Sequence, residues 1–175
     1  MPSERPAGLA RQLLSVLLLP AVATIAIPIL LVLAYGAEVG WGIGGVLSVL
    51  PVLAGAVLMF AGLRLAYETM SLFGTKGEGT LAPWDPTRKL VVLGPYRRVR
   101  NPMISGVCLI LLGEAALLGS TAILIELGIF AAANALWMPL VEEPGLVRRF
   151  GDEYLEYRRA VPRWIPRRRP WSPRG

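Results

Sequence analysis

The stretch GPYRRVRNPMISG, from Gly94 to Gly106, divides the chain because it is basic and turn-rich and lies between two long apolar regions. Its two prolines, Pro95 and Pro102, predict corners, since proline lacks an amide hydrogen and restricts the residue before it. The tyrosine and three arginines between these corners offer an aromatic face and charged donors, which suit a small ligand that carries a carboxylate or a phosphate. A basic loop is also common between membrane helices that bind no ligand, so the stretch has two interpretations.

The composition places the chain among integral membrane proteins. Of its 175 residues, 54% are hydrophobic and 17% are charged, and the mean hydropathy is +0.55, which is too apolar for an ordinary soluble domain. The net charge of +6 does not indicate a nucleic-acid partner, because Lys and Arg occur only before Ser15, between Arg64 and Arg100, and after Val147. These clusters flank charge-poor blocks, which is the pattern of membrane topology.

The residue inventory limits the chemistry. The chain contains no histidine, which excludes a zinc site of the usual kind and a histidine-based catalytic triad. The single cysteine, Cys108, lies in an apolar run and is interpreted as a packing residue. Any reaction must therefore use carboxylates, arginine, tyrosine or a bound cofactor, and no metal is expected.

Four apolar stretches predict membrane spans, since about 20 apolar residues cross a bilayer. We expect an all-α integral membrane bundle of about four transmembrane helices in a single domain, residues 1–175, followed by an interfacial helical segment. Pro20 and Pro28 predict a kink in the first span, Arg64 is expected to end the second, and Gly119-Ser120 is expected to separate the last two. The predicted spans are 13–37, 39–63, 102–118 and 121–141.

Two features inside the spans carry further expectations. Small residues in the second span, among them Gly55 and Gly62, are expected to let helices approach closely. Glu114 and Glu126 are acids at membrane depth, which are functional candidates by default. Both fall near the predicted Gly119-Ser120 turn, where a carboxylate can reach water, so a structural interpretation is favoured for them.

The C-terminal part predicts a helix on the membrane surface. Leu146, Phe150, Tyr154 and Tyr157 recur at helical spacing and form an apolar stripe, and Gly151 is expected to break this helix in two. The Arg-, Pro- and Trp-rich tail that follows is expected to anchor to anionic lipid. Neither short turn between spans contains Lys or Arg, so both termini and the long central loop are predicted to face the cytoplasm.

Two adjacent acids, Glu142 and Glu143, stand where the last span ends. They are interpreted either as helix N-terminal acids that the helix dipole stabilises or as acceptors for a ligand hydroxyl or ammonium. The predicted topology brings them to the same side as Tyr96 and its arginines. A carboxylate, an aromatic ring and cations are therefore expected to converge in one cytoplasmic site built from the segments 74–101 and 142–166.

Several short motifs together carry a resemblance to a known family. They are GPYRRVRNP at 94–102, EEP at 142–144, RFGDEY at 149–154 and YRRAVP at 157–162. In order and spacing the chain resembles the isoprenylcysteine carboxyl methyltransferase family, in its bacterial form, which is related to the phospholipid N-methyltransferases. The resemblance implies a multi-helix membrane enzyme that binds S-adenosyl-L-methionine without a Rossmann fold, and the chain shows no Gly-x-Gly-x-x-Gly after a strand.

The resemblance also implies site residues. Asn101 takes the place of the histidine common in the family. The catalytic candidates follow from the residues themselves: an amine acceptor would have to lose a proton, for which Glu142 or Glu143 is the nearest carboxylate. Ile104 stands where many members have tyrosine, and Met138 stands where the eukaryotic prenylcysteine enzymes have an arginine for the substrate carboxylate. The residues implied to contact the cofactor are Arg88, Lys89, Leu90, Val91, Tyr96, Arg100, Asn101, Pro102, Met103, Ile104 and Glu142.

The expected function is methyl transfer from S-adenosyl-L-methionine to a carboxylate, thiol or amine of a lipophilic acceptor that enters from the lipid bilayer. The cofactor carries its own activated methyl group, so the residue inventory suffices. Two alternatives stay open. The chain is a non-catalytic membrane carrier that keeps the cofactor pocket, or a structural bundle whose basic loop only binds anionic lipid.

Overall fold

The structure is a computed structural model that describes residues 18–76 and 90–172, and every regular element in these residues is helical. Three helical stretches, Leu18–Gly42, Gly45–Leu72 and Thr121–Ala160, are long and apolar enough to cross a membrane. The helix Pro102–Leu118 is apolar and shorter. The expected all-α membrane bundle is therefore confirmed.

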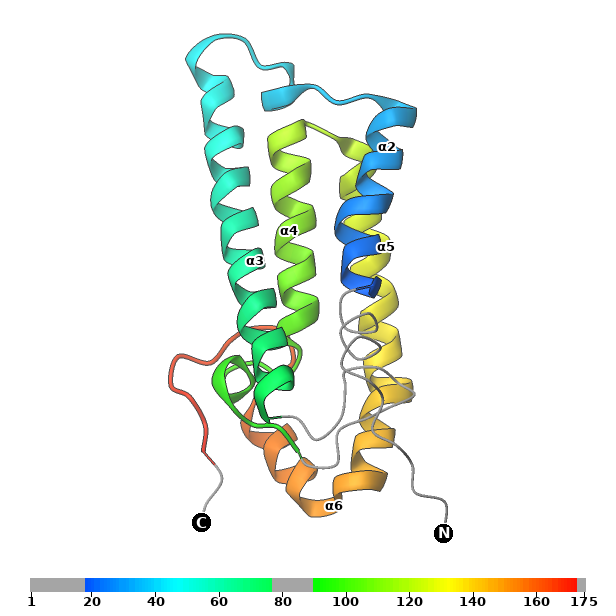
Figure 1. Cartoon of the computed structure of the whole chain (residues 1–175), viewed down its shortest axis with the longest axis vertical. Coiled ribbons are helices and arrows are strands. Elements are labelled where there is room, and N and C mark those ends of the chain that lie inside the picture. Colours follow the sequence, from blue (N-terminus) through cyan, green and yellow to red (C-terminus); the bar gives the residue numbers. More distant parts are fainter. Residues whose placement is uncertain (1–17, 77–89, 173–175) are drawn as a thin grey trace.

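The helices run up and down through the bundle (Figure 1). Helix α3 lies on one side of α4, and α2 and α5 lie on its other side. The bundle contains two π-helical turns: η1 lies just before Pro28, and η5 contains Pro139. The missing amide hydrogens of these prolines interrupt the regular pattern of backbone hydrogen bonds in the helix. The elements are η1 Val22–Ala26, α2 Ile27–Tyr35, η2 Val39–Gly42, η3 Gly45–Ser48, α3 Val49–Lys76, η4 Gly94–Arg97, α4 Pro102–Leu118, α5 Thr121–Trp137, η5 Met138–Glu142 and α6 Glu143–Ala160.

The second helix differs from its prediction at both ends. Residues 39–42 and 45–48 form the two short 3-10 turns η2 and η3, and α3 then continues past Arg64 to Lys76. Arg64 does not end it, because its Nε pairs with Glu68 Oε1 one turn later at 2.8 Å and no helix breaker follows until Gly74. The arginine marks the end of the apolar run and not the end of the helix.

Helices α3 and α4 touch through glycines on both sides. A Cβ atom on Gly62 would lie 2.7 Å from the carbonyl oxygen of Gly106, and one on Gly55 would lie 2.6 Å from that of Gly113. The two glycine pairs are a heptad apart on each antiparallel helix, so they form one seam. Such small-residue seams let membrane helices pack backbone against backbone.

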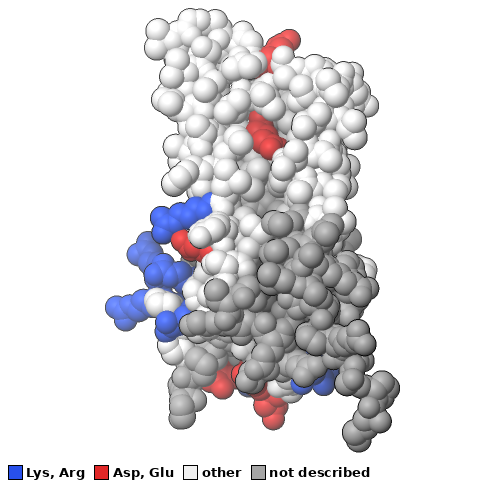
Figure 2. All heavy atoms as spheres, in the orientation of Figure 1, with Lys and Arg blue, Asp and Glu red and all other residues white. Residues whose placement is uncertain are grey.

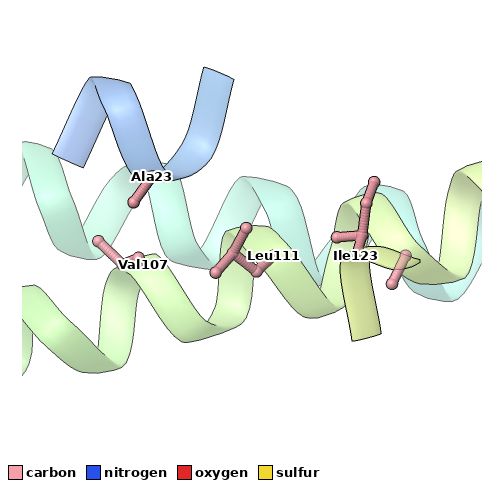
Figure 3. Close-up of a cluster of buried hydrophobic side chains, with 5 residues drawn as sticks. Ala23, Val107, Leu111 and Ile123 are labelled. Carbon is pink, nitrogen blue, oxygen red and sulfur yellow. The ribbon is translucent and has the colours of Figure 1, made fainter. Parts of the chain in front are cut away.

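A buried apolar cluster joins the other helices to α4 (Figure 3). Ala23 from the first span, Val107 and Leu111 from α4 and Ile123 from α5 meet there. At the end of the bundle away from α6, Gly119 adopts a left-handed conformation with φ 59°, and the Ser120 hydroxyl accepts a hydrogen bond from the Ile123 amide. The reversal thus falls at Gly119-Ser120, as the sequence predicts.

Glu114 and Glu126 are half-buried residues, and most of their carboxylate oxygens are shielded. Glu114 Oε2 and both carboxylate oxygens of Glu126 are buried and have no hydrogen-bond partner within residues 18–76 and 90–172. Each residue lies more than one helical turn from the reversal, which keeps it away from that end of the bundle. The expectation that both carboxylates reach water is wrong for these oxygens.

Charge is concentrated at one end of the molecule, which we call the basic end. Figure 2 shows the Lys and Arg atoms of the visible face gathered there, below an almost uncharged upper half. Helix α6 lies at this end and is broken at Gly151, whose φ of 53° is not helical. A second core of Val92, Tyr154, Tyr157 and Val161 holds α6 against the loop after residue 90.

Candidate functional site

The loop of residues 94–101 lies against the C-terminal tail, residues 161–172. The Arg100 amide donates to the Pro162 carbonyl at 2.9 Å, the Arg167 amide to the Arg98 carbonyl at 2.9 Å, and the Trp171 amide to the Arg97 carbonyl at 2.8 Å. Through residue 172 the tail packs on the protein, and its expected anchoring to lipid stays a prediction. The backbone of the loop is therefore fixed by a segment far away in the sequence.

The three loop arginines have different surroundings. Arg97 Nε donates to the Trp171 carbonyl at 2.7 Å, and its guanidinium also donates to the Ser172 hydroxyl. Arg98 is exposed. Arg100 donates from Nη1 to Glu143 Oε1 at 2.7 Å, while its buried Nε has no partner among the described residues. Two of the three arginines thus bind the protein itself.

Glu143 is the centre of a buried ion cluster. Its residue surface is 5% exposed, and Oε1 accepts from Arg100 and from Arg163, whose Nη2 and Nε lie 2.8 and 2.9 Å away. Arg158 Nη1 lies 3.7 Å from Oε2. This carboxylate is committed to cations of the protein, which is the condition under which a charge can be buried.

The backbone of Tyr96 is bound by Tyr157, and its phenol is buried. The Tyr157 hydroxyl donates to the Tyr96 carbonyl at 2.8 Å. Burial raises the pKa of the Tyr96 phenol well above its usual value, and the nearby charges of Tyr157 and Glu142 add to the effect. Tyr96 therefore stays protonated at neutral pH, and Glu142 lies near enough to act on it electrostatically.

The sequence neighbours of Asn101 and Glu142 bind one another. Arg100 precedes Asn101 and binds Glu143, which follows Glu142, so the two residues flank one ion pair. Asn101 precedes α4 at the N-cap position without a side-chain cap, and its buried Nδ2 has no partner in the described part of the chain. Glu142 makes no ion pair there and keeps an exposed surface.

The other expected site residues are distributed around this point. Pro102 is buried in the first turn of α4, and Met103 and Ile104 are half-buried in the same turn. Leu90 and Val91 are half-buried, and Leu90 packs against the Tyr154 and Tyr157 cluster. Arg88 and Lys89 lie outside the described residues.

Sequence reasoning missed the contribution of the tail. Arg163 reaches Glu143, and Trp171 packs on the Tyr157 ring with 5.8 Å between centroids. The alternation of arginine with proline and tryptophan gave no sign of this, because the same composition is typical of a segment that binds lipid.

The donor set fits a zwitterionic cofactor with a ribose, such as S-adenosyl-L-methionine. The buried N–H groups of Asn101 and Arg100, which have no partner among residues 18–76 and 90–172, suit a carboxylate or an ether oxygen. The Glu142 carboxylate suits an ammonium or a ribose diol. Half-buried Leu90, Val91 and Ile104 provide apolar surface nearby in the sequence for a flat base.

Tyr157→Phe is expected to loosen the loop modestly. The change leaves the Tyr96 carbonyl without its donor, and one such hydrogen bond contributes roughly 0.5–1.5 kcal/mol. Thermal unfolding in detergent and hydrogen exchange of the loop amides measure the effect. Tyr67→Phe is the control, since Tyr67 is exposed on α3. Identical exchange in both variants would contradict a role of this hydrogen bond in holding the loop.

Comparison with known proteins gives one family. A family model described as phospholipid methyltransferase matches residues 50–153, more than half of the chain. None of the curated proteins compared with the chain matches it. The matched residues include the glycine seam, the loop and both glutamates, and they end before Tyr154.

Proposed function

Because the chain belongs to the phospholipid methyltransferase family, we propose that it transfers a methyl group from S-adenosyl-L-methionine to the polar head of a lipophilic acceptor. One observation carries this proposal. Tyr96, Asn101 and Glu142 lie at the basic end of an apolar bundle, where the buried donors Asn101 Nδ2 and Arg100 Nε have no partner within the described residues. A polar cofactor can reach this end from water, and the head group of a membrane lipid can reach it from the bilayer surface.

Each candidate residue is assigned to a part of the cofactor according to its charge. Asn101 Nδ2 and Arg100 Nε would donate to the cofactor carboxylate, and Glu142 would accept from its ammonium or its ribose hydroxyls. Tyr96, Pro102, Met103 and Ile104, together with Leu90 and Val91, would line its apolar parts, and Arg88 and Lys89 precede this segment in the chain. When bound, the cofactor supplies an activated methyl group on a sulfonium leaving group.

The protein's own task is to position the acceptor and control its proton. Correct positioning alone supplies on the order of 7–11 kcal/mol in favourable intramolecular reactions. A carboxylate acceptor would lack a cation at position 138, because Met138 is buried and apolar. An amine acceptor must lose a proton, and Glu142 is the nearby carboxylate that makes no ion pair within the described residues. We therefore favour an amine head.

The proposed orientation follows the positive-inside rule. The basic end, which carries the loop, α6 and the tail, faces the cytoplasm of a cell membrane. The Gly119-Ser120 reversal lies at the opposite end. The cofactor then enters from the cytoplasm, since its charged groups are costly to place in hydrocarbon.

The test is labelled methyl transfer by the purified chain into a lipid extract. Transfer from S-adenosyl-L-methionine into an amine-bearing lipid supports the proposal. Cofactor binding without transfer would support the non-catalytic carrier. Absence of binding would leave only the structural bundle.

A long-chain acceptor is expected to react far better than its truncated head group. Exposed Leu112, Leu136 and Trp137 face outward from the bundle and offer apolar surface to an acyl chain. Burying only two methylenes lowers the free energy by roughly 1.6 kcal/mol, so the KM for the intact lipid should be about tenfold lower or better. Initial rates in detergent at matched acceptor concentrations measure this. Equal KM values would argue against entry from the bilayer.

A further inference from the structure

One buried carboxylate holds two distant segments together at the site. Glu143 Oε1 accepts hydrogen bonds from Arg100 in the loop and from Arg163 in the tail. The two guanidinium groups share a single oxygen atom, and without the anion between them they would repel one another. Tail docking beside Arg100 therefore depends on Glu143.

The tail in turn fixes the backbone around the candidate cofactor residues. Its three backbone hydrogen bonds reach Arg97, Arg98 and Arg100, which lie between Tyr96 and Asn101. Arg167 Nη1 donates to the Ala160 carbonyl at 2.9 Å, which secures the tail to the end of α6. Trp171 packs on Tyr157, whose hydroxyl binds the Tyr96 carbonyl.

The tail has an outer side that takes no part in these contacts. Ile165 is 81% exposed, and Arg168 and Arg169 are also exposed. The residues that bind the protein, Arg163, Arg167 and Trp171, are half-buried. A segment that served only to bind lipid would not need this second set of specific contacts.

We propose that the tail, residues 161–172, is a positioning element of the candidate cofactor site and that Glu143 is its anchor. The ion pairs of Glu143 with Arg163 and Arg100 hold Arg100 and the adjoining Asn101 in the arrangement that binds the cofactor. Glu143 is thus a positioning residue, and Glu142, which makes no ion pair in the part of the chain that the structure describes, is left to contact the ligand. This assignment rests on the proposed function, because it concerns the same site.

Hydrogen exchange of the variant Arg163→Ala, made in the full chain, tests the assignment without an activity measurement. The amides of Arg100 and Arg167 are expected to exchange hydrogen faster by roughly tenfold, since a charged hydrogen bond of the docked tail is lost. Arg163→Lys keeps the charge and should restore part of the protection. Arg168→Ala, on the outer side of the tail, should leave exchange unchanged. Unchanged exchange in Arg163→Ala would overturn the proposal.

Cofactor binding separates positioning from simple packing. In Arg163→Ala, the dissociation constant and the KM for S-adenosyl-L-methionine should rise about tenfold, the equivalent of one charged hydrogen bond, while kcat at saturating cofactor stays within about twofold. The unfolding temperature of the bundle should stay that of the parent chain. Faster exchange with unchanged cofactor affinity would make the tail merely structural and overturn the proposal. Failure of the proposed function is recognised separately, because the parent chain itself would then bind no cofactor.

Discussion

Replacing Gly62 with valine is expected to lower the thermal unfolding temperature in detergent more than any other single substitution discussed for this chain. A Cβ atom at Gly62 would lie 2.7 Å from the Gly106 carbonyl oxygen and 2.9 Å from the Ile110 amide nitrogen. Both are backbone atoms of α4, so relief requires the two helices to separate. Overpacking of a core costs roughly 1–3 kcal/mol, and a clash with backbone should reach or exceed the upper value.

The seam also offers matched controls. Gly128→Val in α5 introduces the same side chain where a Cβ atom meets nothing within 4 Å, so it should be nearly neutral. Gly106→Ala should fall between them, because its Cβ atom would lie 3.2 Å from the Gly62 carbonyl oxygen. Equal unfolding temperatures for Gly62→Val and Gly128→Val would show that α3 and α4 do not depend on this contact.

Much of the bundle could be predicted because membrane helices follow from local composition. The long apolar runs and the Gly119-Ser120 reversal are local signals, and both appear in the structure. The length of α3 could not be predicted in the same way. Arg64 ends the apolar run, but the helix is continued by its own hydrogen bonds and by the Arg64–Glu68 pair. Hydropathy indicates which residues cross the membrane, whereas the length of the helix depends on where the next helix-breaking residue occurs.

The two acids within the predicted spans show a second limit. Glu114 and Glu126 lie close to a turn in sequence, which suggested access to water. Their exposure depends on how α4 and α5 are rotated about their axes, and the apolar surroundings of both helices give no strong preference for one rotation. The buried oxygens could therefore be found only from the packed structure.

The end of the bundle at which the candidate site residues lie was predictable, and the ion pairs around them were not. Tyr96, Asn101 and Glu142 were expected near one another because the topology places their segments on one side. The partners of Glu143 were not expected, since many arginines at the basic end have the right charge and sequence does not say which is near. The packing of Val92, Tyr154, Tyr157 and Val161 selects Arg100 and Arg163 by fixing the loop and the tail against α6.

The chain therefore combines two layers with different stabilising forces. Backbone contact through glycines and an apolar cluster holds the membrane bundle, while an aromatic core and a buried ion cluster hold the basic end. Variants in the two layers are expected to act separately. A change in the glycine seam lowers the unfolding temperature, and a change at Glu142 alters ligand affinity in a folded protein.

Glu142→Ala is expected to weaken S-adenosyl-L-methionine by roughly 10–100-fold, since a hydrogen bond to a charged group contributes roughly 1.5–3 kcal/mol. Glu142 is exposed at its surface and makes no ion pair within the described residues, so its loss should not lower the unfolding temperature. Glu142→Gln keeps an acceptor oxygen and should retain part of the affinity. Glu156→Ala, an exposed acid on α6, is the control and should bind as the parent does. Titration calorimetry in detergent measures all four proteins, and parent-like affinity in Glu142→Ala would remove this carboxylate from the site.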